Sequence, residues 1–165
     1  MSLISNTILK VGFNIEEINE TILIKEIPDL LEKGNRLFID TFDCSLKHCK
    51  LVPKEILGCC KIPYDKDLVR LCIRLEPTKE VVTIICTPGT RILLGNCEYR
   101  KARKLKVSDK LIAFPEYYGV IESIDFIDTK DQELYAIDVS FGNLEKEFLR
   151  DPRNYSLGCG IFCKL

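Results

Sequence analysis

Short runs rich in β-branched residues follow one another along almost the whole chain, and this feature most restricts what the chain can fold into. Such runs favour strands, because branched side chains pack well on a pleated surface. The turn-forming pairs Gly34-Asn35, Pro88-Gly89 and Gly95-Asn96 separate several of them. Many short strands with close turns predict an all-β fold in which the chain folds back on itself. The expected strands are Thr7–Val11, Thr21–Ile24, Arg36–Asp40, Leu68–Leu75, Glu80–Cys86, Thr90–Leu94, Lys110–Phe114, Gly119–Asp128 and Glu133–Val139.

Helical patterns are confined to one or two short segments. Pro28–Lys33 has a proline early, an acid in its first turn and a base in its last, and Gly34 follows directly. Together these signals are typical of a short helix and its stop. Glu98–Leu105 is the second candidate, for a single helical turn.

The length of the chain and its charge fit one ordinary globular domain. At 165 residues, we expect a single domain over residues 1–165 that buries a core without staples. The formal net charge of −1 creates no global field that would draw the chain to nucleic acid or to anionic lipid. No apolar run approaches the ~18 residues of a membrane span. The chain is therefore expected to be soluble and monomeric, with no membrane contact and no nucleic-acid partner.

The cysteines indicate a reducing compartment. The chain has nine of them, an odd number, and no basic segment followed by a long apolar run that would indicate a secretory signal. We expect unpaired thiols and a cytoplasmic protein. The spacings Cys44-x4-Cys49 and Cys159-x3-Cys163, and the adjacent pair Cys59-Cys60, fit zinc sites poorly. Buried, inert thiols are the better interpretation, with no metal and no cofactor.

Known motifs follow one another in order at Ser2–Leu9, Thr87–Thr90, Lys101–Lys110, Tyr135–Val139 and Arg153–Tyr155. Taken together they resemble the Hint fold that inteins share with hedgehog autoprocessing domains. Each motif is weak alone, but their order and spacing cover essentially the whole chain. The resemblance implies a pseudo-twofold, horseshoe-like all-β domain with one or two short helices. The matching segments are Ser2–Leu9 at the opening, Thr87–Thr90 for the T-P-x-H motif, Lys101–Lys110 for a "kAkeLkvGDk" segment with Ser108 in place of glycine, Tyr135–Val139 for "vYDiev", Arg153–Tyr155 for "HNy", and the closing strand that ends at Leu165.

The resemblance also implies where the chemistry of protein splicing would lie. In that family the side chain of the first residue attacks the preceding peptide bond, and the histidine of the T-x-x-H motif assists. A terminal asparagine then cyclises, and a neighbouring histidine donates protons. These roles correspond here to the candidate site residues Ser2, Thr87, Thr90, Asp138, Arg153, Lys164 and Leu165.

Several of these positions depart from the family pattern. Thr90 stands where the histidine is expected, and its hydroxyl does not titrate near pH 7. Lys164 replaces the second histidine, and with an ordinary lysine pKa of about 10.4 it is mostly protonated. Leu165 has no amide and cannot cyclise, while Ala136 stands where an aspartate is frequent, with Asp138 two residues on. The sequence therefore predicts an autoprocessing domain whose catalysis is lost or crippled, capable at most of a single turnover on a flanking extein-like polypeptide.

A non-catalytic alternative stays open at this point. The same residues are compatible with a β-rich binding or structural domain that reuses the Hint scaffold, because function depends on the site and not on the fold. In that case Cys163 and the basic run Arg100–Lys106 would contact a partner. The basic run is more often a solvated face than a nucleic-acid contact.

Overall fold

The all-β prediction is confirmed by a computed structural model that describes residues 3–45, 48–115, 117–128, 132–140 and 154–164. One α-helix, α1 (Ile27–Glu32), and two short 3₁₀ helices, η1 (Ile24–Glu26) and η2 (Ala102–Lys104), accompany the strands. The strands are β1 (Leu3–Ile4), β2 (Ile8–Gly12), β3 (Glu20–Leu23), β4 (Phe38–Ser45), β5 (His48–Tyr64), β6 (Leu68–Glu76), β7 (Val81–Cys86), β8 (Arg91–Leu93), β9 (Tyr99–Lys101), β10 (Lys110–Leu111), β11 (Tyr118–Ile127), β12 (Gln132–Val139), β13 (Tyr155–Ser156) and β14 (Phe162–Lys164).

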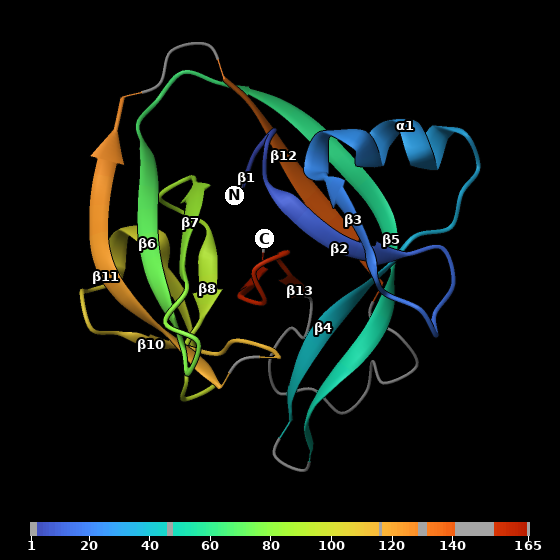
Figure 1. Cartoon of the computed structure of the whole chain (residues 1–165). Coiled ribbons are helices and arrows are strands. Elements are labelled where there is room, and N and C mark those ends of the chain that lie inside the picture. The colour runs from blue at the N-terminus through green and yellow to red at the C-terminus, as the bar shows by residue number, and fades with distance from the viewer. Residues whose placement is uncertain (1–2, 46–47, 116, 129–131, 141–153, 165) are drawn as a thin grey trace.

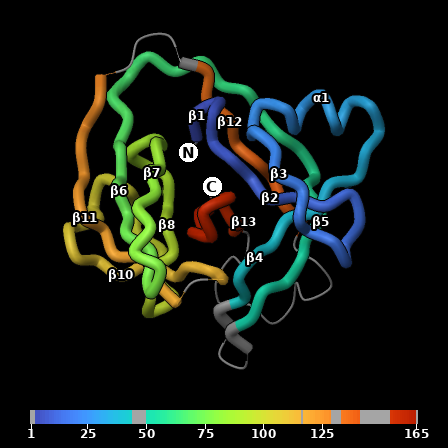
Figure 2. The backbone as a smooth tube through the Cα atoms, viewed as in Figure 1, coloured from blue at the N-terminus to red at the C-terminus, as the bar shows by residue number. Residues whose placement is uncertain are grey.

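Two β lobes face each other across the middle of the molecule. A 10-stranded sheet has the order β10-β11-β6-β7-β1-β12-β5-β4-β2-β3. In this order β1 lies near the middle, with four strands on one side and five on the other. A smaller sheet has the order β13-β14-β8-β9. In Figure 1, one lobe contains β6, β7, β8, β10 and β11, and the other contains β2 to β5 with α1. The long strand β5 curves along the second lobe and leads at its end to the first. The same view as a tube shows both chain ends between the lobes (Figure 2).

The long strand β5 is the main element that the sequence pattern did not predict. It contains Pro53 and Pro63, which normally argue against a strand inside a sheet. The register explains the exception: residues 48–55 pair with β4 and residues 56–64 pair with β12. Each half of β5 is thus paired with a strand on one side only in the described sheet. Proline has no N–H to donate, so a strand tolerates it where the backbone does not face a partner strand.

The predicted helix at Pro28–Lys33 is confirmed, with its start one residue earlier. Gly34 follows with φ +82°, the left-handed conformation that glycine adopts readily and that ends many helices. The second predicted helical segment, Glu98–Leu105, is wrong over its first half. Tyr99–Lys101 forms strand β9, because it pairs with β8, and only Ala102–Lys104 turns as η2.

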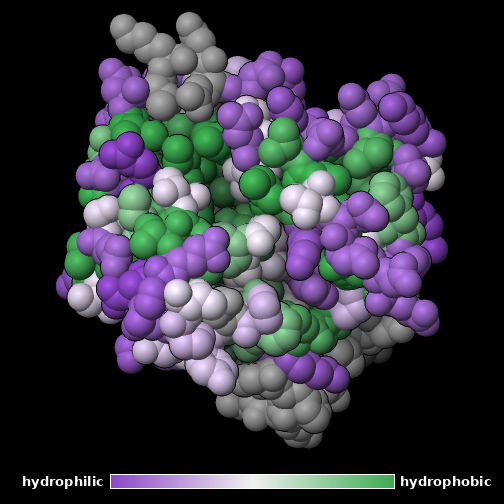
Figure 3. Space-filling model, viewed as in Figure 1, coloured by the Kyte–Doolittle hydropathy of each residue, from purple (hydrophilic) through white to green (hydrophobic). Residues whose placement is uncertain are grey.

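The core lies between the lobes and under the sheets. In the middle of β6 alternate residues face inward, and Leu71 and Ile73 are fully buried. In Figure 3 hydrophobic residues gather around the hollow between the lobes, while hydrophilic ones cover the outer rim. No helix in the described ranges is long and apolar enough to cross a membrane. No disulfide joins the cysteines whose side chains the structure describes.

Candidate functional site

The start of the chain lies beside the Thr87–Thr90 turn. β1 is held between β7 and β12, and the Cα of Leu3 is in register with Cys86 on one side and with Tyr135 on the other. Cys86 is the last residue of β7, and Thr87 follows it directly. The first described residue is therefore about one strand spacing, ~4.8 Å, from the strand that leads into this turn.

The turn itself is buried and closed by hydrogen bonds. Thr87 and Thr90 are only 6% and 2% exposed, and their hydroxyl oxygens lie 3.0 Å apart. The Thr90 N–H donates to the Thr87 carbonyl at 3.0 Å, and the Ala102 N–H donates to the Thr90 carbonyl at 2.7 Å. These contacts fix the two threonine hydroxyl groups in place, and neither hydroxyl is an acid or base near neutral pH.

Two buried thiols lie at the same centre. Burial raises the pKa of Cys86 to about 12, and a hydrogen bond with Thr90 opposes this only in part. Burial likewise raises the pKa of Cys163 far above its ordinary value, and a hydrogen bond from the Tyr155 hydroxyl lowers it only in part. Because the thiolate is the reactive form, both thiols are poor nucleophiles at neutral pH.

The end of the described chain also lies next to the Thr87–Thr90 turn, beside the strand that follows it. β14 pairs with β8, and Lys164 is directly opposite Arg91, which follows Thr90 in the chain. Lys164 is 6% exposed, and its Nζ lies 4.8 Å from the centre of the Tyr99 ring. The two ends of the described chain thus meet the β7–turn–β8 unit at its two strands.

Many solved structures match the fold of this chain, although no protein-family model matches the sequence and no curated protein does. An intein from a hyperthermophile superposes with a TM-score of 0.76 at 12% identity over 99% of each chain. A bacterial intein-like domain from Clostridium thermocellum has a TM-score of 0.70 at 16% identity, over 99% of this chain and 98% of that one. A DnaB intein from Synechocystis sp. has a TM-score of 0.70 at 16% identity, over 99% of this chain and 96% of that one. The chain has the intein fold.

Within this intein fold, only part of the predicted site can be located. Thr87, Thr90 and Lys164 lie on or next to the β7–turn–β8 unit. Asp138 is exposed on β12, whereas its neighbours Ile137 and Val139 are buried. Since successive strand residues point to opposite faces, Asp138 lies on the face away from that core. The predicted site residues Ser2, Arg153 and Leu165 lie outside the described residues.

Asn154 is a central residue that the sequence interpretation did not select. Its fully buried side chain accepts from the Phe42 N–H at 2.7 Å and donates to the Phe42 carbonyl at 2.8 Å. It also donates to the Tyr99 hydroxyl at 2.6 Å. Asn154 thereby anchors the last segment of the chain to β4 and to β9. The Arg153–Tyr155 motif includes Asn154, but a motif alone does not distinguish an amide that anchors the fold from one that takes part in catalysis.

Gly160 and Ser108 are two of the five described residues whose backbone has a positive φ. Gly160 has φ +82°, and an added Cβ would lie 2.1 Å from the Phe114 carbonyl oxygen, so only glycine fits before β14. Ser108 has φ +75°, at the position where the related motif has glycine. A non-glycine residue there costs about 1–2 kcal/mol. The serine is thus a departure from the motif at a position where the backbone keeps a left-handed conformation.

Proposed function

We propose that this chain is an intein-type autoprocessing domain in which the chemistry of splicing is lost. The observation that carries the proposal is the meeting of both ends of the described chain at one unit: Leu3 beside Cys86, and Lys164 beside Arg91. Splicing needs its two junctions at a single site, and a binding module has no such requirement. The partners would be the polypeptides that flank the domain, and the cytoplasmic location stays a prediction.

The loss of chemistry follows from the groups present at that centre. The T-x-x-T turn offers two hydroxyls that bond to each other where a histidine would exchange protons. The family has a second histidine at the position of Lys164, whose ammonium lies against the face of the Tyr99 ring. Leu165 lacks the amide nitrogen that an asparagine uses for cyclisation. Burial raises the pKa of the nearby Cys86 and Cys163 thiols, so they are poor nucleophiles at neutral pH and do not take over the role of Ser2.

Fusion of the unmodified chain between two unrelated proteins tests this proposal. We expect the fusion to stay intact, with neither a spliced product nor a released C-terminal flank, as measured by intact mass over several days. The matched control is the same fusion carrying Ser2→Ala, so that any cleavage common to both is background hydrolysis. A ligated product of the two flanks from the unmodified chain would overturn the proposal.

A further inference from the structure

Three cations are directly opposite one another across the small sheet. In the register of β14, β8 and β9, Lys164 pairs with Arg91, and Arg91 pairs with Lys101. We call these three residues the cationic row. Opposite residues on neighbouring antiparallel strands project from the same face with Cβ atoms roughly 4.5–5.5 Å apart, and like charges so placed destabilise the sheet. The chain keeps an arrangement that works against its own stability, which is common at functional sites.

The cationic row lines a groove of about 530 Å³. Its other lining residues are Glu98, Tyr99, Arg100 and Lys104, so five of the seven are cationic and one is anionic. Arg100 is balanced from outside the groove by Asp109, whose Oδ2 lies 3.0 Å from its Nη1. The groove therefore retains an excess of positive charge in a chain whose net charge is −1.

The innermost cation of the groove is held in place. Lys164 is buried, its Nζ is 4.8 Å from the centre of the Tyr99 ring, and the Tyr99 hydroxyl accepts from the buried Asn154 at 2.6 Å. A lysine on a surface samples many rotamers, and fixing it against a ligand costs side-chain entropy. Here the fold has already restricted Lys164, so a ligand would meet a partly preorganised charge.

We propose that this groove binds a small multivalent anion carrying at least two phosphate groups. The excess charge calls for more than one negative charge on the ligand, and each phosphate ester carries about −1.5 to −2 at neutral pH. The planar guanidinium of Arg91 suits two phosphate oxygens at once, and lysines beside it bind phosphate as point charges. A volume near 530 Å³ lies in the ordinary range for small-molecule sites. The net charge of −1 provides no global field that would attract a long nucleic acid. The proposal does not depend on the splicing function.

Calorimetric titration of the purified full chain with tripolyphosphate, at constant ionic strength, tests the proposal. We expect one saturable site, and a roughly tenfold weaker dissociation constant for Arg91→Gln or Lys101→Gln, because each removes a charge-assisted contact. The matched control, Lys66→Gln, removes an exposed lysine outside the groove and should leave binding unchanged. In the ligand-free chain at low salt, Lys101→Gln should also raise the denaturation midpoint, since it relieves the like-charge row.

Four results would overturn the proposal. One is the absence of saturable binding to the folded chain, and another is equal weakening by Lys66→Gln, which would indicate a diffuse charge effect. The third is tighter binding to a single-stranded oligonucleotide than to tripolyphosphate, lost in the same two variants, which would make the groove a nucleic-acid contact. Weaker binding of Lys101→Gln accompanied by a lower denaturation midpoint would assign the lysine a structural role and would also contradict the proposal.

Discussion

Restoring the family-type residues together should recover measurable cleavage of the flanking polypeptides, whereas each restoration alone should stay nearly silent. The quadruple variant is Ser2→Cys, Thr90→His, Lys164→His and Leu165→Asn. A positioned acid or base contributes about 10²–10⁴-fold to a rate, so one that is still missing hides the gain from the others. Groups that act as a unit are strongly non-additive, and the combination is therefore the meaningful test. The measurement is single-turnover cleavage of the tripartite fusion, followed by intact mass.

A matched variant separates the two ends of this reaction. With Leu165→Ala in place of Leu165→Asn, the other three restorations should still permit N-terminal cleavage but no release of the C-terminal flank. Position 90 is buried, so the histidine must be accommodated, and the fold of each variant should be checked by urea denaturation. A folded quadruple variant that cleaves at neither end would refute the account and would favour a binding module on the same scaffold.

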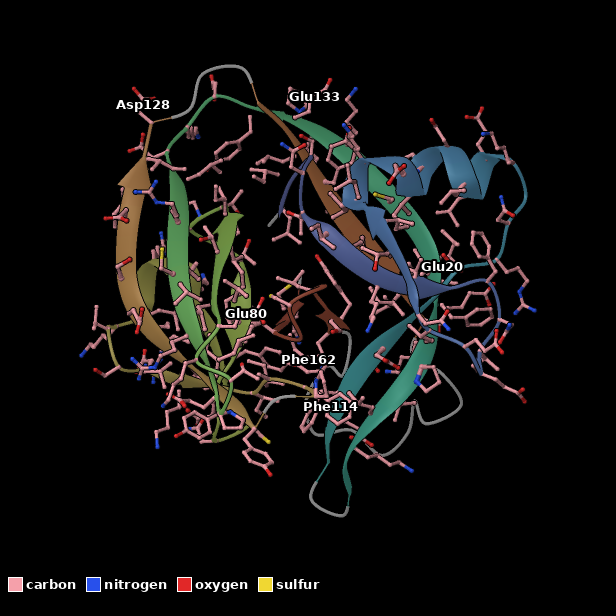
Figure 4. The ribbon with its side chains drawn as sticks, viewed as in Figure 1. Glu20, Glu80, Phe114, Asp128, Glu133 and Phe162 are labelled. Atoms are coloured by element: carbon pink, nitrogen blue, oxygen red, sulfur yellow. The ribbon has the colours of Figure 1, made fainter. Side chains whose placement is uncertain are left out.

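Phe162→Ala should destabilise the chain by about 3–5 kcal/mol, because it removes a fully buried ring and leaves a cavity. The Phe162 ring packs against Phe42, with centroids 5.4 Å apart, and joins the C-terminal strand β14 to β4 of the other lobe. Figure 4 shows Phe162 between the two lobes. Loss of this contact should loosen the position of Lys164, two residues on. The measurement is the free energy of unfolding in urea.

Phe114→Ala is the matched control for that substitution. Phe114 is labelled near Phe162 in Figure 4, but its side chain is 49% exposed. Its backbone N–H donates to the Gly160 carbonyl at 3.0 Å, a bond that the substitution preserves. We expect a loss of about 1 kcal/mol, since only part of the ring leaves a dry environment. Equal losses for the two variants would contradict the description of Phe162 as a buried contact between β14 and β4.

The sequence predicts elements well where pattern and pairing agree. Leu68–Leu75 was expected as a strand, and β6 forms there inside the large sheet, between β11 and β7. β5 escaped prediction because its prolines are tolerated only through a change of partner halfway along the strand, which no local pattern encodes. The segment at Tyr99–Lys101 looked helical because local propensity does not include its pairing with β8.

The site is less predictable than the fold, for a physical reason. The Pro88-Gly89 pair indicates a turn locally, so the closed loop at Thr87 and Thr90 could be anticipated. The approach of Lys164 to Arg91 and Tyr99 could not, because it depends on strands that are far apart in the chain. For the same reason the basic run looked like a solvated face, although the structure adds Arg91 and Lys164 to it in one groove.

Residual acyl transfer at Ser2 is the most direct test of the claim that the chemistry is lost. The unmodified chain, fused to an upstream protein, would be incubated with hydroxylamine, which cleaves an ester formed by an N-to-O shift and leaves a hydroxamate on the released upstream protein. We predict release no faster than from the folded Ser2→Ala control, because the turn provides hydroxyls in place of an acid or base. Rapid, stoichiometric release that requires Ser2 would show a working first step and would contradict the account.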